Sequence, residues 1–384
     1  MTELLYYTDA YISRFTATVL SCESAGNAWR VVLDKTAFFP ESGGQSADTG
    51  MIATSRVTDA KIKDGVVYHI TDSPVTVGEV CDCSLDFEER FAKMQCHTAE
   101  HIISGLIHTH FGYDNVGFHL GGEDVTLDIS APLDRKELDF IEELANRAVF
   151  ENIHVVTEEL FGDAVKTRAY RSKLDFSDAD SVRVVTVPGY DACACCAPHV
   201  SHSGEIGIIK LLDFCSYKGG VRIHMAAGSR ALADYRKRYT AVAAISASLS
   251  APQCEVAEAV CQTVKRLSDA EYKLKEQELI FARALAEALT YTAENRVEYL
   301  PMLTLASLRE FSNFAAAKTG GILVALTGSE GDYKYVIYSK NRNLSELSGK
   351  INAALNGKGG GRGEMLQGSF SSKLFEIKDF FEKL

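Results

Sequence analysis

The N-terminal part of the chain alternates short apolar runs with turn-forming residues. From Tyr6 to about Leu85, segments rich in β-branched and aromatic residues are separated by glycine, proline, aspartate and serine. Many short strands at such spacing are typical of a small barrel or sandwich. We therefore expect a small β-barrel over residues 1–87, with a loop that contains Gly43, Gly44 and Gln45.

The pattern changes to a helical period at residue 88. Apolar positions recur on one face from 88 to 110, which predicts a helix, and a second helix is expected over 132–152, where Asp134 suits a helix start. The middle of the chain is therefore predicted to be an α+β domain over residues 88–232. Its strand-like segments lie at 153–160 and 182–187 and, as a pair, within 204–228.

Residues 233–297 are almost all helix formers, with Pro252 as the interruption. Apolar residues fall seven apart between charged neighbours, which is part of a heptad pattern. A helical hairpin or short coiled coil fits this helical spacer, and one long amphipathic helix packed on its own domain fits equally. The four heptad positions are Val260, Leu267, Leu274 and Phe281.

The last part of the chain, residues 298–384, is predicted to be a separate α/β domain. Two β-rich runs within 321–339 flank a turn with two glycines, which predicts a hairpin. A helix is expected over 343–357, with Gly357 as its C-terminal stop. The fold class is therefore α+β, in four parts.

Composition limits the classes of protein that the chain can belong to. The sequence of 384 residues has no basic and apolar leader at its N-terminus, so we expect a cytoplasmic protein with no membrane segment. Its ten cysteines are scattered, which favours reduced thiols over disulfides. The net charge of −12 argues against strong non-specific binding of nucleic acid, although a local basic surface is compatible with it.

Two pairs of residues could share a metal ion. His97 and His101 stand four apart on the first predicted helix, and Cys195 and His199 stand four apart in the sequence CACCAPH. Imidazole and thiolate ligands together indicate zinc first. Each pair alone has a simpler interpretation. The two histidines could be surface or packed residues, and the cysteines could be buried thiols.

The segment HTAEH also fits the zinc-peptidase pattern H-x-x-E-H, in which Glu100 would be the general base. This alternative needs a distant glutamate as third ligand and leaves CACCAPH unexplained. In a peptidase, replacing Glu100 by Gln should abolish activity; in the alternative below it should leave activity largely intact.

Three motifs in order carry a resemblance to a known family. The sequences FFPESGGQSADTG, HTAEHIISG and CCAPHVSHSGEIGIIK resemble the editing domain that alanyl-tRNA synthetases share with free-standing AlaX proteins. The later sequence GKGGGRGEMLQGSF resembles the glycine-rich element of the DHHA1 domain of synthetases and long AlaX forms. The resemblance extends over almost the whole chain.

The resemblance implies a zinc-dependent hydrolase that removes serine from mischarged alanine tRNA, with glycine as a second candidate. It makes His97, His101, Cys195 and His199 the ligands of one zinc ion (Zn2+), which would polarise the ester, activate water or only orient the substrate. It assigns no role to Glu100, which is then a solvated helix residue. The residues that it places at the substrate are Thr36 as reader of the serine hydroxyl, Gly43, Gly44 and Gln45 as pocket wall, and His119.

Partners are implied in the same way. Lys358 and Arg362 of the glycine-rich element would contact the tRNA backbone, unless that element is a flexible linker. The helical spacer or the last domain could form a homodimer. The sequence begins directly with the predicted barrel, so we expect no aminoacylation core. A second hypothesis is a non-catalytic module that binds tRNA or a synthetase and uses zinc as a closed structural ion.

Overall fold

The computed structural model describes residues 1–122, 125–176 and 179–384, and it is a mixed α+β structure with several sheets. The chain forms two compact units, Met1–Val242 and Ala243–Leu384. The α+β class predicted from the sequence is confirmed. The finer division into four domains stays a prediction.

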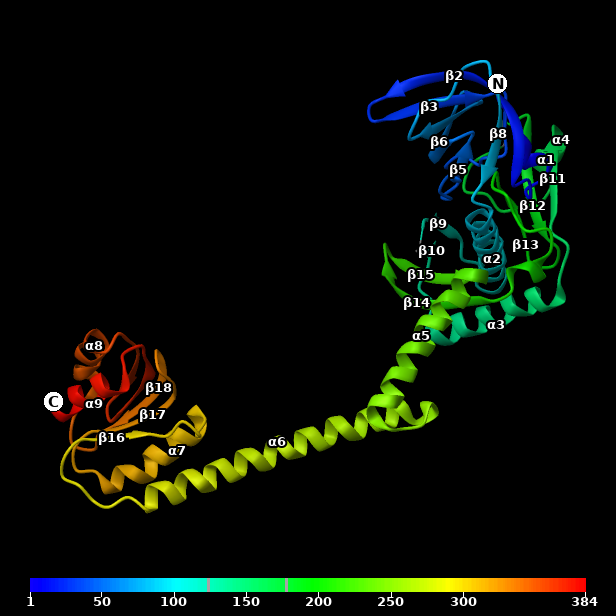
Figure 1. The fold of residues 1–384 in the computed structure, drawn as a ribbon. Coiled ribbons are helices and arrows are strands. Elements are labelled where there is room, and N and C mark those ends of the chain that lie inside the picture. The colour runs from blue at the N-terminus through cyan, green and yellow to red at the C-terminus, as the bar shows by residue number, and fades with distance from the viewer. Residues whose placement is uncertain (123–124, 177–178) are drawn as a thin grey trace. The chain divides into compact units, whose positions relative to one another are not determined.

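The first unit begins with a sheet that closes on itself. Its strands turn one side to a shared apolar interior, as in β8 (Val80–Leu85), where Cys81, Cys83 and Leu85 are buried and alternate with more exposed residues. A short parallel pair, β1 (Glu3–Leu4) and β4 (Lys35–Thr36), lies beside it. Figure 1 shows the closed sheet in blue near the N-terminus. The strands pair in the closed order β2 (Arg14–Ala25), β3 (Ala28–Leu33), β7 (Val66–Thr71), β6 (Ser55–Lys63), β5 (Gly50–Ile52) and β8 (Val80–Leu85).

Helix α2 (Phe87–Phe111) is the central element of this unit, and every residue from Ala92 to Ile107 is buried. It confirms the helix predicted for 88–110, and it ends where Gly112 takes a left-handed φ of 70°. A helix buried on all sides must give partners to its polar side chains, because an unpaired buried polar group costs free energy. The polar residues of α2 therefore mark the place to look for a site.

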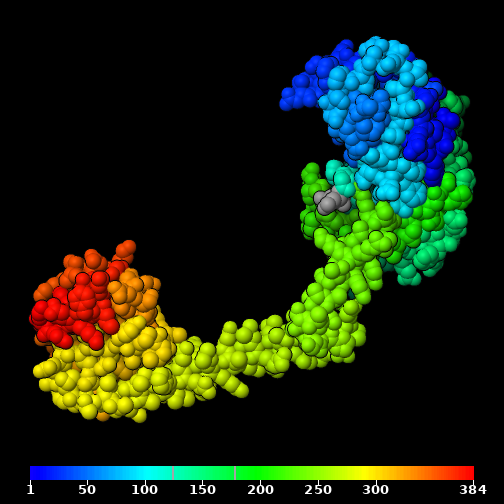
Figure 2. Space-filling view, in the orientation of Figure 1, coloured from blue at the N-terminus to red at the C-terminus, as the bar shows by residue number. Residues whose placement is uncertain are grey.

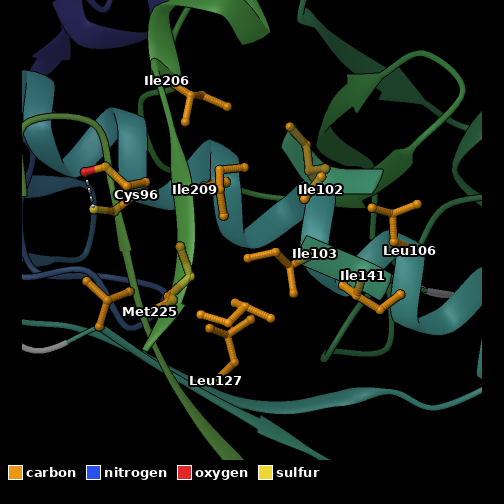
Figure 3. Packing of buried hydrophobic residues seen from close by; sticks show 14 of the residues in the cluster. Cys96, Ile102, Ile103, Leu106, Leu127, Ile141, Ile206, Ile209 and Met225 are labelled. Atoms are coloured by element: carbon orange, nitrogen blue, oxygen red, sulfur yellow. Dashed lines mark hydrogen bonds between the residues drawn. The ribbon is translucent and has the colours of Figure 1, made fainter. Parts of the chain in front are cut away.

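A four-stranded sheet and α3 (Arg135–Glu151) pack on the apolar side of α2. Asp134 caps α3 as predicted, by accepting bonds from the amides of Lys136 and Glu137. Figure 3 shows Ile103 of α2 among the side chains of Leu127, Ile141 and Met225. The sheet has the order β14 (Ile209–Tyr217), β15 (Gly220–Ala227), β10 (Val125–Ile129) and β9 (Asn115–Leu120).

A third sheet brings the cysteine cluster to α2. Its strands are β11 (Val156–Phe161), β12 (Ser181–Val187) and β13 (Asp191–Ala194), so that Cys195 follows directly on β13. The short helices α1 (Leu5–Thr8) and α4 (Asp163–Thr167) complete the unit. Its early and late segments form one continuous surface in Figure 2, with blue and cyan atoms against green ones.

A buried ion pair joins the closed sheet to α2. The Nε atom of Arg90 donates to Asp48 Oδ2 at 2.8 Å, and both side chains are almost fully buried. Arg90 also donates to the carbonyl oxygens of Ala10 (3.1 Å) and Ala37 (2.6 Å). Asp48 Oδ2 accepts the amide of Phe39 at 2.7 Å, which fixes the start of the Gly-Gly-Gln loop.

The second unit contains the end of α5 (Gly228–Leu249) and then α6 (Val256–Glu287). The helical conformation is interrupted between them, around Pro252. The spacer therefore consists of two helices, and the alternative prediction of one long helix does not describe it. A five-stranded sheet follows, with α6 and α7 (Leu305–Ala315) against one face and α8 (Leu344–Ala354) and α9 (Leu374–Glu382) against the other. The sheet order is β16 (Arg296–Tyr299), β17 (Leu323–Ser329), β18 (Asp332–Tyr338), β20 (Met365–Phe370) and β19 (Gly357–Arg362).

Two expectations for this unit are corrected. Gly357 does not stop a helix: α8 ends at Ala354, Asn356 takes the left-handed conformation (φ 48°), and Gly357 begins β19. The glycine-rich element is therefore not a flexible linker but the edge strand of the sheet, paired with β20 along its length. The predicted hairpin within 321–339 is confirmed by β17 and β18.

A fully buried histidine in the closed sheet makes stability depend on pH. Burial lowers the pKa of His69 to about 4. In the unfolded chain His69 takes up a proton below about pH 6.5, whereas in the folded chain it stays neutral until about pH 4. The free energy of unfolding should therefore drop by about 3 kcal/mol between these pH values. Urea titrations followed by the fluorescence of Trp29, the single tryptophan, would report this unit. A His69→Gln variant should lose less stability over that range; an equal loss would contradict the assignment.

Among residues 1–122, 125–176 and 179–384, no helix combines the length and the apolar character that crossing a bilayer requires.

Candidate metal centre

The four residues singled out in the two sequence pairs lie together in the first unit. The donor atoms of His97, His101, Cys195 and His199 are all within 4.8 Å of one another, and all three histidines are buried. The helical spacing of α2 puts its two histidines on one face, and the turn after β13 brings Cys195 and His199 to that face. Residues far apart in the sequence thus form one cluster.

The distances in the cluster fit a tetrahedral zinc ion. Cys195 Sγ lies 3.6 Å from His97 Nε2 and 3.3 Å from His199 Nε2. Tetrahedral zinc with a sulfur at about 2.3 Å and a nitrogen at about 2.0 Å separates these two ligands by about 3.5 Å. The residues present therefore fit such an ion in both chemistry and spacing.

Each histidine is oriented by a polar group at its Nδ1 atom. Gln45 Oε1 lies 2.7 Å from Nδ1 of His97, and Thr98 Oγ1 lies 3.0 Å from Nδ1 of His199. Asp191 Oδ2 lies 3.2 Å from Nδ1 of His101, an ion-pair contact that does not have the geometry of a hydrogen bond. Partners of this kind fix the ring and leave Nε2 free to bind metal. None of the three orienting roles could be read from the spacing of the ligands.

Gln45 owes its position to the two glycines before it. Gly43 and Gly44 have φ values of 59° and 84°, which favour glycine, and a Cβ on Gly44 would lie 2.3 Å from the Phe118 carbonyl oxygen. The amide of Leu120 donates to Gly44 O at 2.7 Å and the amide of Ser46 to Leu120 O at 3.0 Å, so β9 clamps the loop. Gln45, predicted as a pocket wall, contacts a predicted ligand directly.

The electrostatics of the cluster favour a metal cation. Burial opposes ionisation of the Cys195 thiol, but electrostatic interaction with His97 and His199 holds its pKa well below the usual value. Burial lowers the pKa of His199 to about 3, so its imidazole is neutral. Zinc binds thiolate sulfur and neutral imidazole nitrogen, and the environment stabilises these forms at Cys195 and His199. At His101, burial opposes protonation, but the interactions with Asp191 and Cys195 raise the pKa well above its usual value, so zinc binding there would release a proton.

The neighbouring cysteines lie around the cluster. Cys196 Sγ is 3.3 Å from Ser42 Oγ, on the side of the Gly-Gly-Gln loop. Cys193 lies with Asp191 near His101, and burial raises its pKa. A protonated thiol is a poor ligand, so Cys195 is the cysteine best suited to bind zinc.

Glu100 is not the solvated helix residue that the sequence suggested. Its side chain is buried, and Oε1 accepts bonds from Ser104 Oγ at 2.6 Å and from Asn115 Nδ2 at 2.5 Å. Its other oxygen, Oε2, lies 4.0 Å from Nε2 of His101. Glu100 is thus a buried polar neighbour of the cluster.

Thr36 is fully buried, and the structure gives its hydroxyl two partners in the closed sheet. Oγ1 lies 2.8 Å from His69 Nε2 and accepts the amide of Phe38 at 3.1 Å. Because Nδ1 of neutral His69 faces the Val31 carbonyl at 3.1 Å, Thr36 must donate its proton to Nε2. Only one acceptor position of the hydroxyl is then left for a ligand.

His119 is exposed and is not one of the clustered donor residues. It pairs with Thr126 across β9 and β10, whereas the next residue along β9, Phe118, pairs with the core residue Leu127. Adjacent strand residues point to opposite faces, so His119 points away from the core. Phe118 is the residue that contacts His97, with ring centroids 4.9 Å apart, and Lys173 lies over its ring. Phe118 is one position before His119, and the role predicted for His119 at the substrate stays a prediction.

Lys358 and Arg362 lie in the second unit, both exposed, on edge strand β19. They therefore belong to a surface of that unit.

Comparisons with known proteins agree with the motifs. The family model "tRNA synthetases class II (A)" matches residues 2–89, and "Threonyl and Alanyl tRNA synthetase second additional domain" matches residues 182–224. The first match includes Thr36 and the Gly-Gly-Gln loop, and the second includes Cys195 and His199.

Several curated proteins are similar over almost the full chain. The alanyl-tRNA editing protein Aarsd1 of Mus musculus is 27% identical, covering 94% of this chain and 92% of that protein. The alanyl-tRNA editing protein AlaX-L of Pyrococcus horikoshii is 26% identical, covering 100% and 98%. The alanine--tRNA ligase of Ignicoccus hospitalis is 32% identical over 65% of this chain and 28% of its own. The resemblance indicated by the motifs is therefore confirmed.

Proposed function

We propose that this chain, a relative of the alanyl-tRNA editing proteins of the AlaX type, is a trans-editing hydrolase. It deacylates mischarged alanine tRNA, with serine as the expected amino acid and glycine as the next candidate. The observation that carries the proposal is the cluster of His97, His101, Cys195 and His199, each histidine held by an orienting partner. Full-length similarity to proteins named for alanyl-tRNA editing supports it.

The cluster would hold one zinc ion, which supplies a Lewis acid next to the ester carbonyl or orients the substrate there. The chain's own residues do the rest. Gln45, Thr98 and Asp191 fix the three imidazole rings, and the ring of Phe118 against His97 closes one side of the centre. Rigid ligands cost no reorganisation when the substrate arrives.

Specificity for serine requires a buried group that pairs with the substrate hydroxyl, because alanine then leaves that group unpaired. We assign this role to Thr36, whose one open acceptor position suits a donating hydroxyl. Glycine has no such hydroxyl, so serine should be the better substrate. The substrate role predicted for His119 is not tested, and no step proposed here depends on it.

We assign tRNA binding to the second unit, which we interpret as a DHHA1-like domain. Strand β19 presents Lys358 and Arg362 with exposed side chains, and phosphate contacts by such residues position a nucleic acid without reading its sequence. Binding should weaken steeply with salt.

The test is to compare hydrolysis of serine-charged, glycine-charged and alanine-charged alanine tRNA by the purified protein. Serine should be removed fastest and alanine slowest, by a factor of at least about 100. No hydrolysis of any of the three, with tRNA still bound, would favour the non-catalytic zinc module. Cleavage of peptides would favour the peptidase, although its motif requires a third glutamate ligand where this cluster has Cys195 and His199.

We also propose that α6 pairs with a second copy of this chain. Every residue from 264 to 277 is exposed, although Leu267 and Leu274 are apolar and each 59% exposed. A helix segment without tertiary contacts is marginal in water, and its apolar stripe needs a partner. Arg266 directly precedes Leu267, and Glu271 follows Leu267 by four residues. In a parallel coiled coil, Arg266 of one helix would meet Glu271 of the other, whereas an antiparallel pair would bring like charges together.

Charge reversal tests this pairing. Arg266→Glu and Glu271→Lys should each shift the chain from dimer towards monomer in light scattering at about 10 μM, because each makes like charges face each other. An equal mixture of the two variants should recover the dimer, since opposite charges then meet. A wild-type chain that stays monomeric up to about 100 μM would contradict the proposal.

A further inference from the structure

Glu100 is a buried carboxylate whose two oxygens have different surroundings. Oε1 accepts bonds from Ser104 Oγ (2.6 Å) and Asn115 Nδ2 (2.5 Å), and Asn115 is itself fixed because its Oδ1 accepts the amide of Gly117 at 3.0 Å. Asn115 also donates to Ser104 Oγ at 3.0 Å, which closes the network. The carboxylate cannot turn without breaking these bonds.

The second oxygen is directed to the metal centre. Oε2 lies 4.0 Å from Nε2 of His101, and Nε2 is the nitrogen that faces the other donors, since Nδ1 faces Asp191. No described group donates a hydrogen bond to Oε2. The nearby cation, Arg171, is held by both oxygens of Asp191 at 2.7 and 3.0 Å.

Oε2 of Glu100 is not among the fully buried side-chain atoms that lack a partner, so it keeps contact with solvent and a water molecule can reach it. A purely structural network around Ser104 and Asn115 would be served as well by an amide at position 100. The arrangement of one fixed oxygen and one open oxygen beside metal ligands is that of a group which positions a water molecule.

We infer that Glu100 is the general base of ester hydrolysis, an inference that rests on the proposed deacylation. The oxygen of a water molecule bonds to the ester carbonyl carbon while one of its protons passes to Oε2. The bond from that carbon to the ribose oxygen then breaks, and the proton passes from Oε2 to the ribose oxygen. The products are the free amino acid and tRNA with its terminal hydroxyl restored. This reverses the expectation from the sequence that deacylation would be indifferent to Glu100.

The test compares Glu100→Gln with the wild-type chain. Glutamine keeps the shape and an oxygen that can accept from Ser104 and Asn115, but it cannot take a proton. We expect kcat for serine-charged alanine tRNA to fall by about 10² to 10⁴ with KM unchanged within about twofold. Zinc content after purification and the affinity for a non-hydrolysable amide-linked seryl-tRNA should stay at wild-type values.

Glu142→Gln is the matched control. Glu142 lies in α3, is partly buried, and accepts bonds from Lys210 (2.6 Å) and the amide of Leu211 (2.7 Å), so it tests the general effect of removing such a charge. Its kcat should equal that of the wild type.

The inference is overturned if Glu100→Gln deacylates within about threefold of the wild type, or if its lost activity is matched by lost zinc or lost binding of the amide analogue. If Glu100→Gln does not fold, Glu100→Asp decides: a shortened carboxylate should retain zinc with reduced kcat, and full activity would overturn the inference. A wild-type chain that hydrolyses no charged tRNA refutes the proposed function instead, so the two failures are distinguishable.

Discussion

Replacing Cys195 by serine should remove the metal and the deacylase activity together. Cys195 Sγ is the atom that lies near Nε2 of both His97 and His199, and it is the thiol whose pKa the cluster holds lowest. A serine hydroxyl stays protonated and binds zinc poorly. Zinc measured by elemental analysis should fall from about one ion per chain to near zero, and hydrolysis should fall more than about 100-fold.

Cys193→Ser is the matched control for this change. Cys193 lies two residues away with a raised pKa, so it should remain a thiol beside Asp191 and leave the ion in place. Zinc retained in Cys195→Ser and lost in Cys193→Ser would mean that the wrong sulfur has been assigned.

The second large effect is on stability. Asp48→Ala should lower the free energy of unfolding of the first unit by about 3–5 kcal/mol, because it leaves the fully buried guanidinium of Arg90 without its counter-charge. The change also removes the acceptor of the Phe39 amide, at the start of the Gly-Gly-Gln loop. Urea unfolding followed by Trp29 fluorescence measures the change.

Asp139→Ala is the control for loss of an ion pair as such. Asp139 pairs with Arg135 on the exposed side of α3, where water replaces the lost partner, so the unfolding midpoint should not shift measurably. Replacing both buried partners, as Asp48→Leu with Arg90→Met, should cost less than Asp48→Ala alone. Equal stability of Asp48→Ala and the wild type would show that this pair does not hold the sheet to α2.

Much of the fold could be predicted because local patterns decide it. The helical period of residues 88–110, the cap at Asp134 and the hairpin within 321–339 all match elements of the structure. The glycine-rich element could not be predicted as a strand, because glycine has no strand preference of its own. It is a strand because β20 supplies partners along its whole length, which is a tertiary effect.

The site could be predicted only in part, for a related reason. The two pairs of ligands are visible as regular spacings, since a helix and a turn bring them together. The groups that orient them come from three separate elements, and the sequence around Thr98 or Asp191 carries no sign of that role. Glu100 was underrated because the polar face of α2 suggested solvent, whereas packing buries that face as well.

The central claim is that the cluster of His97, His101, Cys195 and His199 makes this chain a metal-dependent deacylase. Protein stripped with a chelator should be titrated with zinc while hydrolysis of serine-charged alanine tRNA is followed. The rate should start near background and rise until about one ion is bound per chain. A stripped protein that hydrolyses this tRNA as fast as the reloaded protein would contradict the account.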